Sequence, residues 1–77
     1  MLKNVSVTDK AAAQNDPDVR KAVAEVAEKL GDSGRILVRE SGTEPLVRVM
    51  VEAESQEKCR EYVDYVIDTI ITKGHAV

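Results

Sequence analysis

The segment Arg35–Glu52, RILVRESGTEPLVRVMVE, holds two runs of aliphatic residues on either side of a polar stretch, RESGTEP. β-Branched residues dominate both runs, whereas the interruption contains the small and turn-forming residues Ser41, Gly42, Thr43 and Pro45. The sequence therefore predicts two adjacent strands, RILVRE and LVRVMVEAE, that this loop joins as a hairpin.

Side chains alternate between the two faces of each predicted strand. Ile36 and Val38 oppose Arg35, Leu37 and Arg39 in the first strand, and Val47, Val49 and Val51 oppose Leu46, Arg48 and Met50 in the second. If the Val and Ile faces meet helices, Arg39 and Arg48 lie on the other face. The hairpin then brings both arginines within reach of one anion.

Two amphipathic helices are expected to flank the hairpin. Asp16 followed by Pro17 is typical of a helix start and Gly31 of its end, and a second helix is bounded by Ser55 and Gly74. Apolar residues recur at three- and four-residue spacing at Val19, Ala22, Val23, Val26, Ala27 and Leu30, and at Cys59, Tyr62, Val63, Val66, Ile67, Ile70 and Ile71. Residues 2–8, LKNVSVT, predict a short edge strand. We expect one α+β domain over residues 1–77, in βαββα order, with two helices packed on one face of a small sheet.

Length and charge limit the function classes. A chain of 77 residues is too small to enclose a deep active site by itself. A net charge of −3 argues against broad nucleic-acid binding, and no apolar run approaches a membrane-spanning length. The single cysteine, Cys59, excludes an intramolecular disulfide and is typical of a reducing compartment, and the N-terminus lacks a signal-peptide core. We therefore expect a cytoplasmic protein with no nucleic-acid or membrane partner.

The residue types in RESGTEPLVR suit a phosphate monoester. Arg39 and Arg48 can each donate charge-assisted hydrogen bonds to phosphate oxygens, and Ser41 and Thr43 add hydroxyl donors. Gly42 allows close approach of the backbone, and with a positive φ it would let successive N–H groups form an anion nest.

Two glutamates and two alternatives accompany this hypothesis. Alternation turns Glu40 to the opposite face, whereas Glu44 must orient an arginine or bond loop amides if it is not to repel the phosphate. The same residues also fit an ordinary hairpin turn whose arginines are solvated or paired with glutamates. Leu37, Leu46 and Met50 on the arginine face would give a non-catalytic protein-interaction module some apolar contact area.

The motif RESGTEPLVRVMVE resembles the C-terminal phosphate-binding loop of the α-D-phosphohexomutases. The form RxSGTEPxxRVMxE is most similar to the bacterial phosphoglucosamine mutase branch, and phosphomannomutases and phosphoglucomutases share the loop. GRILVR, the following helix and the element order also resemble the family's fourth, TATA-binding-protein-like domain, so the resemblance covers essentially the whole chain.

The resemblance implies a function for the loop. It assigns contacts with the phosphate group of a sugar phosphate to Arg39, Ser41, Gly42, Thr43 and Arg48. The full enzyme would interconvert glucosamine 6-phosphate and glucosamine 1-phosphate through a bisphosphorylated intermediate, and so supply the precursor of UDP-N-acetylglucosamine for cell-wall synthesis.

Other family motifs are missing. The chain has no TASHNP serine loop, no DGDGDR metal loop and no GEQSGH sugar loop, so no catalytic or metal-binding residue is expected in it. Mg²⁺ and a phosphoserine are expected on other domains, which together with the sugar phosphate are the expected partners. We expect a domain excised from a longer protein, with Met1 added for expression, or a natural stand-alone module. Glu40 occupies a variable motif position where proline is frequent.

Three further features favour structural interpretations. Cys59 lies on an apolar helix stripe, which predicts a buried, unreactive thiol. His75, beyond Gly74, is expected in a frayed tail and lacks neighbours for a metal site. Asp64 and Asp68 lie opposite the apolar stripe and predict a solvated helix face rather than a metal pair.

Overall fold

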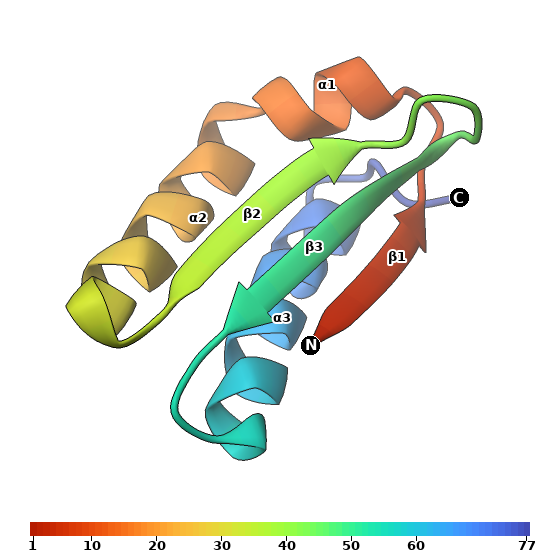
Figure 1. Cartoon of the computed structure of the whole chain (residues 1–77). Helices are drawn as coiled ribbons and strands as arrows, with labels where there is room; N and C mark the ends of the chain where they lie inside the picture. Colours follow the sequence, from red (N-terminus) through yellow and green to blue (C-terminus); the bar gives the residue numbers. More distant parts are fainter.

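A computed structural model describes all 77 residues. Along the chain lie β1 (Leu2–Ser6), α1 (Lys10–Asn15), α2 (Pro17–Leu30), a 3₁₀ turn (Gly31–Ser33), β2 (Arg35–Glu40), β3 (Leu46–Glu52) and α3 (Gln56–Thr72). The strands form one antiparallel sheet in the order β1-β3-β2, and α2 and α3 cover one of its faces (Figure 1). The predicted α+β class is confirmed. No helix combines the length and apolar character needed to cross a membrane.

The central strand β3 divides the sheet into a helix-covered face and an open face. Val47, Val49 and Val51 are fully buried under the helices. On the open face Leu37 pairs with Met50, and Arg39 pairs with Arg48. The predicted alternation is therefore confirmed, and it puts both arginines on the uncovered side of the sheet.

The long helices begin where the sequence predicts. Asp16 caps α2 by accepting hydrogen bonds from the backbone N–H groups of Asp18 and Val19, and Ser55 caps α3 in the same way through Lys58. Their buried residues are Val19, Ala22, Val26 and Leu30 in α2 and Cys59, Val63, Val66 and Ile70 in α3.

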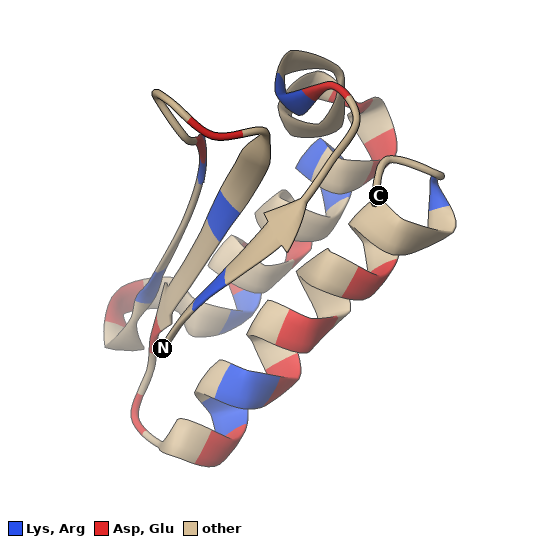
Figure 2. Cartoon of the chain, turned by 90° about the vertical axis from the view of Figure 1, so that its right-hand side faces the viewer, with Lys and Arg blue, Asp and Glu red and all other residues tan.

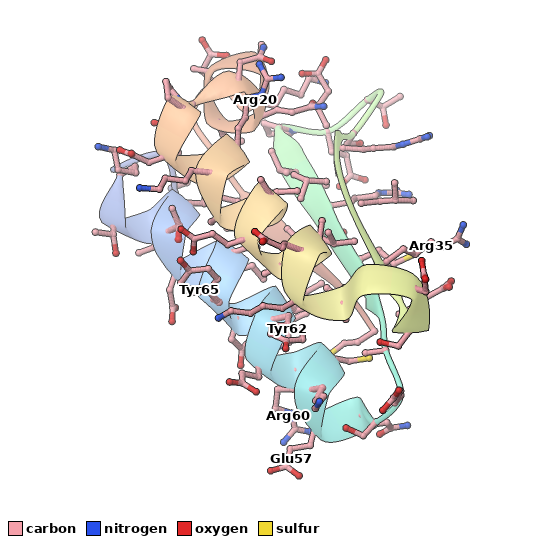
Figure 3. All side chains as sticks on the ribbon, turned by 90° about the vertical axis from the view of Figure 1, so that its left-hand side faces the viewer. Arg20, Arg35, Glu57, Arg60, Tyr62 and Tyr65 are labelled. Atoms are coloured by element: carbon pink, nitrogen blue, oxygen red, sulfur yellow. The ribbon has the colours of Figure 1, made fainter.

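One residue of the predicted α3 stripe was placed wrongly. Ile71 is 51% exposed, because a rotation of about 100° from the buried Ile70 carries it past the sheet. In Figure 3, α2 and α3 lie side by side with Tyr62 and Tyr65 on α3. Tyr62 packs against the core, and the Tyr65 hydroxyl donates a hydrogen bond to Glu25 of α2, which raises the pKa of Tyr65.

The helix α1 is absent from the sequence prediction. Asp9 caps it by accepting a hydrogen bond from the backbone N–H of Ala12, and Ala13 is fully buried. A six-residue helix is too short to show an apolar period, although Asp9 followed by an alanine-rich run is a start signal. The observed order is thus βααββα, an elaboration of the predicted βαββα.

The prediction of a frayed C-terminal tail is wrong. The backbone N–H of Thr8 donates to His75 O, that of Val77 donates to Ser6 O, and Val7 forms an antiparallel bridge with Ala76. The tail therefore pairs with residues 6–8 at the end of β1. This arrangement depends on contacts between distant parts of the sequence.

A hydrogen bond and an ion pair join the end of α3 to the start of α2. His75 Nε2 lies 2.7 Å from Asp16 Oδ2, and Lys73 Nζ lies 2.7 Å from Asp18 Oδ2. The hydrogen bond with His75 lowers the pKa of Asp16 against the opposing effect of desolvation, and its capping bonds lower it further. The hydrogen bond with Asp18 raises the pKa of Lys73.

Acid should weaken the fold partly through Asp16. Because its pKa is lowered on folding, its stabilising effect is complete above pH of about 4 and is lost as the pH falls through the lowered value. Asp16→Asn keeps a helix-capping side chain but removes this titration. Between pH 5 and about 2.5, we expect the unfolding temperature of the variant to fall less than that of the wild type. Asp68→Asn, at an exposed site, is the control, and equal acid sensitivity in all three proteins would contradict the assignment.

Gly34 is required by a close backbone contact between β2 and β3. A Cβ at this position would lie 2.1 Å from the carbonyl oxygen of Glu52 and 3.1 Å from Cα of Ala53. Backbone atoms cannot rotate away, so Gly34→Ala is expected to destabilise the domain by about 1–3 kcal/mol in denaturant unfolding. Gly42→Ala, where a Cβ meets nothing within 4 Å, is the matched control. Equal midpoints for the two variants would refute this contact.

Candidate anion-binding site

Arg39 and Arg48 lie directly opposite each other on the open face of the sheet. Like charges at directly opposed positions destabilise a sheet, and neither arginine forms an ion pair within the chain. Arg35 on the same face differs, because its Nε lies 3.1 Å from Glu52 Oε2. The Arg39–Arg48 pair is therefore an uncompensated cationic site suited to an anion from outside the chain.

The two arginines border an apolar hollow. Leu2, Met50 and Leu37 form a row across the three strands, and with Arg39 and Arg48 they line a concavity of about 310 Å³. Leu2 is 56% exposed and Leu37 is 39% exposed. The open face thus combines a positive pair with an adjacent apolar row.

Ser41 organises the β2–β3 loop from within. It is the one buried polar residue of the chain, and its Oγ accepts hydrogen bonds from the backbone N–H groups of Thr43, at 3.4 Å, and Glu44, at 3.2 Å. Its own N–H donates to Leu46 O, and Pro45 O accepts from the N–H of Val7. These bonds fix the loop without using either arginine.

Gly42 and Thr43 form the exposed tip of the loop. Gly42 does not adopt the positive φ that an anion nest would need, since only Gly31 and Gly74 have positive φ values. The physical reason lies in Ser41, whose hydroxyl takes up two of the loop N–H groups that a nest would point at an anion. The N–H of Gly42 has no partner within the chain and stays available to a ligand.

The two glutamates of the loop differ in placement. Glu40 pairs with Val47 and so points to the face opposite the arginines, as predicted. The Glu44 carboxylate bonds neither an arginine nor a loop amide. The loop amides are bonded by the Ser41 hydroxyl instead. Glu44 is exposed, so its charge is screened by solvent.

Two residues that sequence reasoning missed contact this region from α1. Lys10 Nζ donates to Ser41 O, and the side chain of Gln14 bonds Val38 O and the N–H of Glu40. Residues four apart lie on the same face only if the segment is helical. Because α1 was not predicted, the spacing of Lys10 and Gln14 could not indicate a shared contact with β2.

The predicted burial of Cys59 is confirmed, whereas Asp64 and His75 have partners that the sequence did not predict. Cys59 is a buried free thiol. Asp64 forms an ion pair with Lys3 of β1 at 2.8 Å, and Figure 2 shows charged positions of both signs along α3. His75 pairs with Asp16 in the helix cap.

The sequence matches a known family of protein domains. Residues 2–69 match the model described as "Phosphoglucomutase/phosphomannomutase, C-terminal domain". The chain belongs to this domain family. Over 77 residues it is 66% identical to phosphoglucosamine mutase of Lachnospira eligens, and over 75 residues it is 56% identical to that of Lachnoclostridium phytofermentans. These matches include 100% and 97% of the chain, but the chain spans only 17% of the length of each relative.

Solved structures of phosphohexomutases share the fold. An N-acetylphosphoglucosamine mutase of Aspergillus fumigatus, in complex with glucose 1,6-bisphosphate, matches 97% of the chain with a TM-score of 0.79 and 23% identity. An N-acetylglucosamine-phosphate mutase in a product complex matches 87% with a TM-score of 0.70 and 28% identity. The chain spans 15% and 14% of the length of these proteins.

Proposed function

We propose that the chain is the substrate-phosphate-binding domain of a phosphoglucosamine mutase. The uncompensated pair of Arg39 and Arg48 beside the exposed tip of the loop supports this proposal most strongly. Two guanidinium groups on adjacent strands can bracket a phosphate dianion and donate several charge-assisted hydrogen bonds to it. Gly42 N–H and the Thr43 hydroxyl add donors at the tip, and Ser41 orders the loop in advance of binding.

The choice of sugar rests on the relatives. The similar curated proteins are phosphoglucosamine mutases, whereas the family model also covers phosphoglucomutases and phosphomannomutases. We therefore assign interconversion of glucosamine 6-phosphate and glucosamine 1-phosphate to the parent enzyme. Assays of that enzyme with glucosamine, mannose and glucose phosphates decide between these substrates.

Within this reaction the domain would hold the phosphate group that is not reacting. Phosphoryl transfer depends mainly on positioning and charge stabilisation, so a rigid clamp on one end of the sugar orients the other end for attack. No group of three His, Cys, Asp or Glu side chains in the chain could hold a metal ion. We assign two groups to the remainder of the enzyme. A phosphoserine would supply the transferring phosphoryl group, and Mg²⁺ would stabilise its charge.

An amide-shift titration of the 77-residue chain tests the proposal. Glucosamine 6-phosphate and glucosamine 1-phosphate should both shift the backbone amides of Gly42 and Thr43, whereas glucosamine should not. The affinity will be weak because contacts from other domains are absent. If neither phosphate moves these amides, or if glucosamine moves them equally, the loop is not a phosphate site.

A further inference from the structure

We propose that Lys10 and Gln14 of α1 are positioning residues for the phosphate site, an inference that rests on the proposed function. The two side chains lie one helical turn apart, so they project from the same face of α1. That face meets the free edge of β2 and the first residue of the loop, at the point where the Arg39 strand gives way to RESGTEP.

Gln14 holds the backbone on both sides of Arg39. Its Oε1 accepts from the N–H of Glu40 at 3.0 Å, and its Nε2 donates to Val38 O at 3.4 Å. These are the main-chain groups that precede and follow Arg39, and no strand pairs with them because β2 is an edge strand. The Gln14 amide thus occupies the place of a neighbouring strand and fixes the segment that carries the arginine.

Lys10 continues this support into the loop. Its ammonium group donates to Ser41 O at 2.5 Å in a partly buried contact. The Ser41 hydroxyl accepts hydrogen bonds from the N–H groups of Thr43 and Glu44. By holding Ser41 in place, Lys10 therefore stabilises the conformation of the loop tip. Main-chain groups of Val38, Glu40 and Ser41 are thereby anchored from α1.

This anchoring affects binding because a backbone segment that is already ordered loses less conformational entropy when the arginine it carries captures phosphate. Neither Lys10 nor Gln14 needs to touch the ligand. Without Gln14 the end of β2 has an unpaired edge and frays, and the cost of re-ordering it is subtracted from the affinity.

The decisive variant is Gln14→Ala, which changes no charge. Two measurements are made on the 77-residue chain, namely hydrogen exchange of the Glu40 amide and titration with glucosamine 6-phosphate followed at Gly42 and Thr43. We expect the Glu40 amide to exchange faster, the Val49 amide to keep its protection, and the affinity to fall about threefold to tenfold, the effect of roughly one hydrogen bond. Asn15→Ala, the same type of change at an exposed neighbour in the same helix, should alter neither quantity.

Lys10 is tested by a conservative rescue. Lys10→Met should weaken binding, and Lys10→Arg, which keeps a cationic donor, should restore most of it, whereas Lys21→Met at an exposed site of α2 should have no effect. Unchanged affinity in both Gln14→Ala and Lys10→Met would overturn the positioning role alone. Absence of any response in the unsubstituted chain would overturn the proposed function, and the positioning role with it.

Discussion

Arg39→Ala in the full-length parent enzyme is expected to lower kcat/KM for glucosamine phosphate by about tenfold to a hundredfold. Hydrogen bonds to a charged group contribute about 1.5–3 kcal/mol each, and Arg39 has no carboxylate in the chain that would take up its charge. Arg48→Ala should cause a loss of the same order because the two residues face each other across adjacent strands. Steady-state kinetics measures both effects.

The matched control for this prediction is Arg35→Ala. Arg35 lies on the same strand and the same face as Arg39, but it is paired with Glu52 at the end of the sheet away from the loop. Its removal should change kcat/KM by less than about threefold, since exposed ion pairs contribute little. Losses of equal size in all three variants would indicate a general effect of surface charge and contradict the phosphate clamp.

Ile70→Ala is expected to cause the largest loss of stability. Ile70 is fully buried between α3 and the sheet, and such truncations cost about 2–5 kcal/mol. A domain of this size has roughly 4–12 kcal/mol in total, so a large part of the stability would disappear. Denaturant unfolding of the chain measures the change.

Ile71→Ala provides the control at the adjacent position. Ile71 is 51% exposed, so the same chemical change should cost less than about 1 kcal/mol. A larger loss for Ile71→Ala than for Ile70→Ala would mean that α3 presents a different face to the sheet.

The hairpin and its two faces were predictable because strand alternation depends on local sequence alone. Val49 and Arg48 must point in opposite directions whatever else the chain does, so the arginine pair followed from the sequence. The contribution of α1 was not predictable, since a six-residue helix carries no apolar period and Gln14 acquires its role only through packing against β2.

The loop conformation and the tail depend on information that the sequence does not display. Whether Gly42 takes a positive φ is decided by competition between an open nest and the Ser41 hydroxyl, which bonds two loop amides. The pairing of His75 with Asp16 joins residues 59 positions apart, a separation at which no local pattern is informative.

A crystal structure of the parent enzyme with bound glucosamine 6-phosphate tests the central claim most directly. We predict that the phosphate group lies between Arg39 and Arg48, with oxygens about 2.7–2.9 Å from both guanidinium groups. A structure in which carboxylates from the rest of the enzyme neutralise both arginines, with the phosphate group bound elsewhere, would contradict it.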